Sequence, residues 1–241
     1  MFLELVTAVL GATTFTLVVN TWLTQIRLKR INTHLEKGEP AKFLQEIERE
    51  LQRTTHEPVR TLLQINRSAG LVYLGSFDQG LAVLHAVDRT HFKKWTGQAR
   101  RLLTSLYYNN LLYTLLLDRR YDEARQVVAE AEGFLVPQPG AHQLDLCLQG
   151  TMAVYQYFCG NPAASRRTFE HLCTLDWPDQ FKACNFYFLG RLELFEGNFE
   201  QGMANIERAA RLAPNSYLGE EPRRLAEGRE RVGAPGEGTR S

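Results

Sequence analysis

Apolar side chains form one uninterrupted stretch near the amino terminus and recur at helical spacing along the rest of the chain. Residues 5–23 read LVTAVLGATTFTLVVNTWL and include no charged side chain. At ~1.5 Å of rise per residue, this stretch makes a helix about 28 Å long, which is close to the hydrocarbon thickness of a bilayer. The pattern predicts a transmembrane anchor over residues 1–27, with the membrane itself as one binding partner.

Basic residues follow this stretch at Arg27, Lys29 and Arg30, whereas only Glu4 and the terminal amine precede the stretch. The positive-inside rule then places the remainder of the chain in the cytoplasm. We therefore expect a single-pass membrane protein with its second domain on the cytoplasmic side. The alternative is a cleaved signal sequence and an exported, periplasmic or secreted module. A signal sequence needs basic residues before the apolar run and a small-x-small cleavage site after it, and neither is present.

One face of the predicted anchor carries small and polar residues at a spacing of four: Ala8, Ala12, Thr16 and Asn20. Small residues at this spacing let two helices approach closely in lipid, and Asn20 can form a hydrogen bond across such a contact. These residues are candidates for association of the anchor, so a homo-oligomer is one expectation. The alternative is plain anchoring, because Thr and Ala are common in membrane helices.

Beyond residue 30, amphipathic runs of helical period alternate with short breaks, and no run has the two-residue period of a strand. The breaks begin at residues 38, 75, 120, 160 and 197, at intervals of 37, 45, 40 and 37 residues. A repeated helix–turn–helix unit of this length predicts an α-solenoid, because a single pair cannot bury its apolar face and neighbouring pairs must stack. The expected fold is all-α, with helix pairs over residues 28–231 and a disordered, Gly-rich tail over residues 232–241.

The last of these units carries the most complete set of motif residues: Phe186, Leu189, Gly190, Gly197, Phe199, Gly202, Ile206, Ala209 and Pro214. These residues resemble the tetratricopeptide-repeat (TPR) family. The units around Gly75, Tyr121 and Gly160 keep parts of the pattern. In the unit around Gly160, Pro162 replaces the aromatic residue of the turn. Together with the apolar amino terminus, the layout resembles bacterial membrane-tethered TPR proteins.

The resemblance implies a groove lined by the first helix of each pair. Carried over onto this chain, the positions that face the groove in the family include Tyr73, Asn109, Tyr113, Tyr157, Tyr187 and Arg191. Such an apolar and aromatic groove suits an amphipathic helix or an apolar peptide segment of a partner protein. The alternative is that these inner positions pack against the next helix pair.

The charge balance and the reactive residues narrow the function further. Lys and Arg number 28 against 27 Asp and Glu, so the chain has no basic footprint for nucleic acid. The four cysteines form no C-x-x-C pair, the histidines form no H-E-x-x-H motif, and no phosphate-binding glycine motif occurs. We expect no catalytic, cofactor or metal site. The predicted function is a membrane-anchored scaffold or adaptor, with an exported module or an all-α enzyme as the alternatives.

Overall fold

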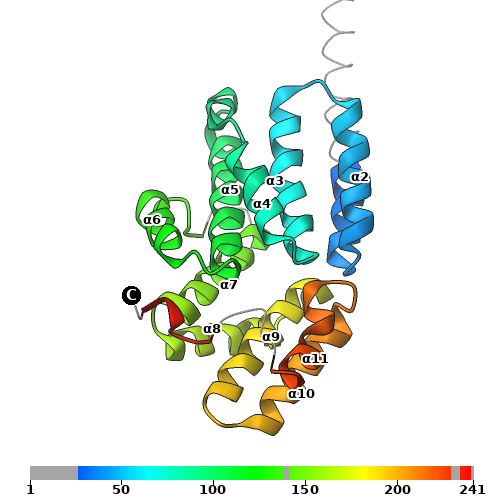
Figure 1. Ribbon diagram of the computed structural model, residues 1–241. Helices are drawn as coiled ribbons and strands as arrows, with labels where there is room; N and C mark the ends of the chain where they lie inside the picture. The colour runs from blue at the N-terminus through cyan, green and yellow to red at the C-terminus, as the bar shows by residue number, and fades with distance from the viewer. Residues whose placement is uncertain (1–26, 138–141, 229–233, 240–241) are drawn as a thin grey trace, which may run out of the picture.

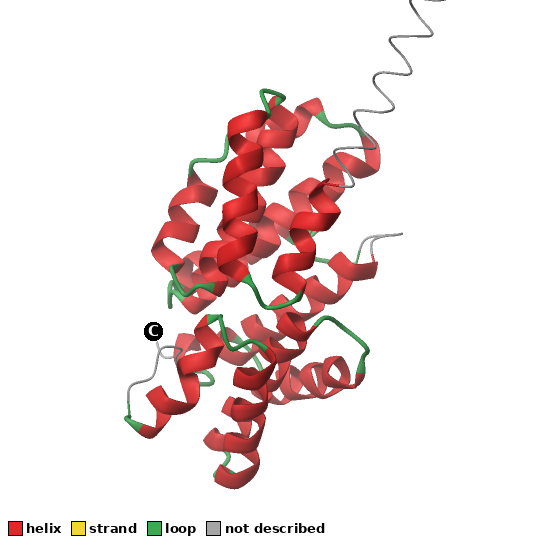
Figure 2. Ribbon diagram, turned by 90° about the vertical axis from the view of Figure 1, so that its right-hand side faces the viewer, coloured by secondary structure: helices red, strands yellow, loops and turns green. Residues whose placement is uncertain are grey.

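The computed structural model describes residues 27–137, 142–228 and 234–239 (Figure 1). Throughout these ranges the secondary structure consists of helices and turns without a strand, as Figure 2 shows. The all-α prediction is therefore confirmed for the described part of the chain. The amphipathic runs of the sequence correspond to helices because each one buries its apolar face against its neighbours.

The predicted single-pass membrane localisation, with the repeats on the cytoplasmic side, is contradicted. No helix in the described ranges is both long and apolar enough to cross a bilayer. Even α5 (Gly97–Leu117) carries Arg100, Arg101 and two asparagines among its leucines. The stretch at residues 5–23 lies outside the described residues, and so do the predicted association residues Ala8, Ala12, Thr16 and Asn20.

Consecutive helices form antiparallel pairs joined by tight turns (Figure 1). The pairs are residues 27–36 with α2 (Pro40–Arg53), α3 (Glu57–Tyr73) with α4 (Phe77–His85), α5 (Gly97–Leu117) with α6 (Tyr121–Ala131), α7 (His142–Cys159) with α8 (Pro162–Thr174), and α9 (Asp179–Phe195) with α10 (Phe199–Leu212). The 3-10 helix η1 (Arg89–Lys94) connects α4 to α5. The 3-10 helix η2 (Tyr217–Glu220) and α11 (Glu221–Ala226) follow α10, and the 3-10 helix η3 (Glu237–Thr239) lies near the carboxyl terminus.

The turns between paired helices lie at the predicted breaks. Gly38, Gly75, Arg119 and Gly197 have positive φ angles of 69°, 75°, 62° and 89°. A residue in this conformation ends a helix and lets its last carbonyl groups accept hydrogen bonds from the turn. The α7–α8 turn differs, because the Asn161 side chain accepts hydrogen bonds from the first N–H groups of α8 instead.

Aromatic residues follow three of the turns, and two of them pack against later segments of the chain. The Tyr121 ring, after the α5–α6 turn, lies 5.2 Å from the Phe158 ring at the end of α7. The Phe77 ring, after the α3–α4 turn, lies 5.7 Å from the Tyr217 ring of η2. Phe199 has the same position in the last pair, and it is 68% exposed because no further pair follows it in the described chain.

The segment after α10 returns to the beginning of the array. The Asn215 side chain donates a hydrogen bond to the Gly38 carbonyl at 3.4 Å, which links residues at the two ends of the helical array. The Tyr217 hydroxyl lies 3.2 Å from the Tyr113 hydroxyl of α5. The carboxyl-terminal segment therefore closes one end of the space between the first helices of the pairs.

Part of the tail for which the sequence predicts disorder is ordered. The Gly236 N–H donates a hydrogen bond to the Tyr157 carbonyl at 2.8 Å, and the Tyr121 hydroxyl donates to Glu237 at 3.2 Å. A Cβ atom at Gly238 would lie 2.8 Å from the Cys159 sulfur. Glycine therefore allows this segment to approach α7 closely, a role that Gly-rich composition alone does not indicate.

Candidate ligand-binding cavity

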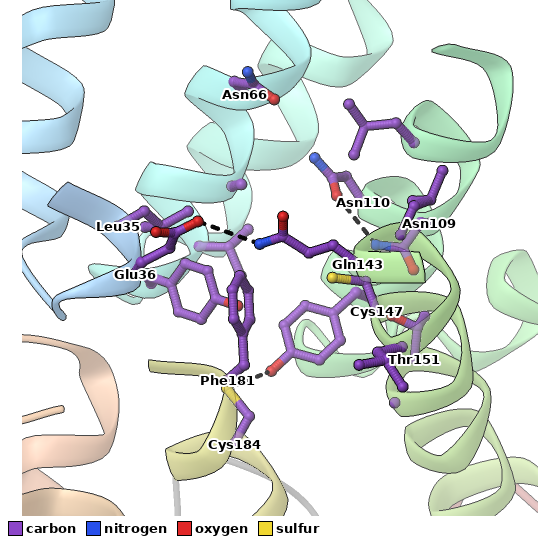
Figure 3. Close-up of a pocket in the computed structure, with 18 of the residues that line it drawn as sticks. Leu35, Glu36, Asn66, Asn109, Asn110, Gln143, Cys147, Thr151, Phe181 and Cys184 are labelled. Carbon is purple, nitrogen blue, oxygen red and sulfur yellow. Dashed lines mark hydrogen bonds between the residues drawn. The ribbon is translucent and has the colours of Figure 1, made fainter. Parts of the chain in front are cut away.

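A cavity of about 330 Å³ lies between the first helices of the pairs (Figure 3). Residues 27–36, α3, α5, α7 and α9 supply most of its lining, and Phe43 of α2 and Phe169 of α8 add to it. Successive pairs turn their first helices toward this space, so residues far apart in the sequence meet there. The size falls within the range of ~300–1,000 Å³ that is typical of small-molecule pockets.

Three of the predicted groove residues line this cavity: Tyr73, Asn109 and Tyr113. Tyr157, Tyr187 and Arg191 lie elsewhere, and their side chains are 0%, 0% and 3% exposed. Of the six predicted groove residues, the structure therefore brings together at the cavity only those on α3 and α5. Tyr157 packs against Phe188 of the next helix pair, whereas Tyr187 and Arg191 are enclosed by the segment after α10.

Arg191 belongs to a buried hydrogen-bond network that joins α9 to α11. Its guanidinium donates to the Tyr187 hydroxyl at 3.2 Å, and that hydroxyl donates to the Glu221 carboxylate at 3.1 Å. Burial raises the pKa of Tyr187 well above its ordinary value, so the phenol remains a neutral donor. The network holds the segment after α10 in place, which is a structural role for Arg191.

The floor of the cavity consists of uncharged phenol and thiol groups. The Tyr113 hydroxyl donates to the Cys184 sulfur at 3.6 Å and lies beside Tyr217. Burial raises the pKa of the Cys184 thiol to about 11 and that of the Cys147 thiol to about 12. Burial also raises the pKa values of Tyr73 and Tyr113 well above the ordinary range, so these groups are neutral at physiological pH.

Carboxamide groups form the polar part of the wall. Asn110 donates to the Ile65 carbonyl at 3.1 Å, and Asn109 donates to the Asn110 side-chain oxygen at 3.3 Å. Because a carbonyl only accepts, this chain of bonds fixes the orientation of both amides and leaves the Asn109 Oδ1 atom as an acceptor. Neither this atom nor the Nδ2 atom of Asn185 has a hydrogen-bond partner in the described part of the chain.

The cavity wall contains one charged side chain among the described residues, the carboxylate of Glu36. It accepts a hydrogen bond from the Gln143 side chain at 3.3 Å, and Figure 3 shows this bond crossing from the first helix to α7. No Lys, Arg or His from the described ranges lines the cavity. No group of three or more His, Cys, Asp or Glu residues that could hold a metal occurs in these ranges.

Sequence reasoning missed the amide-rich character of the cavity. Asn66, Asn110 and Gln143 line it, although none of them belongs to the groove positions taken from the TPR pattern. Adjacent asparagines inside a helix are an available signal, because Asn is unfavourable in a helix interior. Asn110 is retained there because its side chain bonds the Ile65 carbonyl of the neighbouring α3.

Comparisons with protein-family models, curated proteins and solved structures give no match for this chain. The function proposed below therefore rests on the residues of the cavity and on the arrangement of the helices around it.

Proposed function

We propose that this protein is a non-enzymatic helical-repeat scaffold of the TPR type, and that its central cavity binds an apolar segment of a partner protein. The observation that carries the proposal is the shared cavity, to which the first helices of successive pairs all contribute. In a TPR-like solenoid, the first helices of successive pairs likewise line one shared concave surface. The proposal thus joins the repeat pattern of the sequence to the lining of the cavity.

An amphipathic helix is the occupant that the lining favours. Leu62, Leu106, Leu144 and Phe181 supply apolar surface from α3, α5, α7 and α9. Burying one large apolar side chain of a partner there contributes ~1.5–3 kcal/mol, so two or three such side chains support a stable complex. The Trp177 and Phe181 rings stack at 4.9 Å and extend this surface.

The chemistry of the wall supports binding better than catalysis. An activated nucleophile needs a lowered pKa or a neighbouring base. Burial instead raises the pKa values of Cys147 and Cys184 to about 12 and about 11, so neither thiol is activated. Glu36, the one carboxylate of the wall, bonds the amide of Gln143 and faces no catalytic partner among the lining residues.

The proposal is tested with a labelled amphipathic helical peptide of Leu and Lys and a scrambled peptide of the same composition. We expect saturable binding of the amphipathic peptide to the full chain. Ala69 lines the cavity, so Ala69→Leu should fill part of it and weaken binding at least about tenfold, the loss of about one anchor side chain. Fluorescence anisotropy measures both affinities.

The matched control is Ala82→Leu, which makes the same change at an exposed site on α4. It should leave the affinity unchanged. Equal weakening by the two variants, or equal affinity for the scrambled peptide, would show that the cavity does not bind the peptide.

A further inference from the structure

Polar and apolar groups are separated along the cavity. Figure 3 shows Asn66 and Asn110 toward its upper end, the Gln143 carboxamide at mid-height beside Glu36, and Phe181 and Cys184 below them. A molecule with one apolar and one polar end therefore fits this cavity in one orientation, with its apolar end at the floor.

The floor is closed. The Tyr113 hydroxyl bonds the Cys184 sulfur, and Tyr217 of η2 lies against Tyr113 from the other side. These rings therefore limit how far a ligand reaches toward this end of the cavity. The closed floor suits a short ligand that inserts by its end, and it sets an upper limit on the length of the apolar part.

The charge of the wall selects among the polar ends that such a ligand could carry. A carboxylate moved into the cavity loses its hydration and meets no cationic side chain among the described lining residues. It also meets the negative charge of Glu36. Moving a hydroxyl or carboxamide group into the cavity costs much less free energy, because the carboxamides of the wall replace its hydrogen bonds to water.

The wall carboxamides that keep accessible surface are those of Asn66, Asn110 and Gln143, and they offer both donors and acceptors to a ligand. Hydroxyl and carboxamide groups both donate and accept, whereas an ionised carboxylate only accepts.

We propose that the cavity binds a small neutral amphiphile, an apolar chain that ends in a hydroxyl or a primary carboxamide, and that it excludes the corresponding carboxylate. The inference rests on the same cavity as the proposed function. It adds a class of ligand that is not part of a protein and that competes with the apolar segment of a partner.

This proposal is tested by isothermal titration calorimetry of the full chain at pH 8. The ligands are octanamide, octan-1-ol and octanoate, which share an apolar chain and differ at the polar end. We expect octanamide and octan-1-ol to bind, and octanoate to bind at least about tenfold more weakly. Hexanamide should bind about sixteenfold more weakly than octanamide, at about fourfold per methylene group.

Two variants place the ligand in the cavity. Ala69→Leu should weaken octanamide at least about tenfold, whereas the exposed control Ala82→Leu should not. Glu36→Gln should strengthen octanoate binding severalfold relative to octanamide binding, and the control Glu200→Gln at an exposed site should leave the ratio of the two affinities unchanged. The proposal is overturned if octanoate binds as tightly as octanamide, or if neither octanamide nor octan-1-ol binds. If the amphipathic peptide still binds in that case, the proposed function stands without this ligand.

Discussion

Arg191→Met is expected to destabilise the protein by ~3–5 kcal/mol, because it removes a buried guanidinium from the network that links Tyr187 and Glu221. Arg191 and Glu221 are 3% and 0% exposed, and the Tyr187 hydroxyl lies between them. Urea unfolding followed by circular dichroism measures the loss. Arg211→Met, which removes an exposed arginine from a surface ion pair with Glu207, should cost less than ~1 kcal/mol.

The double variant Arg191→Met/Glu221→Gln should recover a substantial part of the loss, because it removes both charges and keeps a side chain that bonds Tyr187. The interaction energy from this cycle should exceed ~1 kcal/mol. Strictly additive effects of the two substitutions would show that these residues are not energetically linked.

Gly190→Ala is expected to destabilise the protein by ~1–3 kcal/mol, although alanine favours helices over glycine by up to ~1 kcal/mol. A Cβ atom at Gly190 would lie 2.7 Å from the Gly202 carbonyl oxygen and 2.7 Å from the Ile206 side chain. Because one of these atoms is backbone, α9 and α10 must move apart to admit the methyl group.

Gly150→Ala is the matched control, because it makes the same change inside α7. A Cβ atom there would lie 3.8 Å from Leu172 and 3.9 Å from Asn185, which are ordinary contacts. This variant should therefore be more stable than the parent by up to ~1 kcal/mol. A common sign for the two substitutions in urea unfolding would contradict the packing described for α9 and α10.

The paired helices were predictable because their signals are local. Gly75 adopts the positive φ angle that ends α3, and Phe77 packs directly after it. The interval of 45 residues between the breaks at 75 and 120 also has a local cause. The short α4 ends at His85, and η1 occupies the extra length before α5. The proximity of Gly190 to α10 agrees with the small-residue positions of the repeat pattern.

The site was only partly predictable, because contacts distant in sequence decide which inner residues remain accessible. Tyr217 and Glu221 lie in a short polar region after Pro214, where no periodic pattern indicates burial. Both are nevertheless buried, and they contact Tyr113 and Tyr187. This return of the chain encloses Tyr187 and Arg191 and leaves Tyr73 and Tyr113 at the cavity.

Alkylation rates of the four cysteines, measured by mass spectrometry in the intact chain, test most directly whether the cavity is the binding site. Cys147 and Cys184 line the cavity, whereas Cys159 and Cys173 do not. With pKa values raised by burial to about 12 and about 11, the two cavity thiols should react slowly at pH 9, and their rates should rise about tenfold per pH unit below those values.

Saturating amphipathic peptide should slow the alkylation of Cys147 and Cys184 at least about tenfold and leave Cys159 and Cys173 unchanged. Equal slowing of all four thiols, or no slowing of Cys147 and Cys184 under conditions where the peptide is bound, would contradict binding in the cavity.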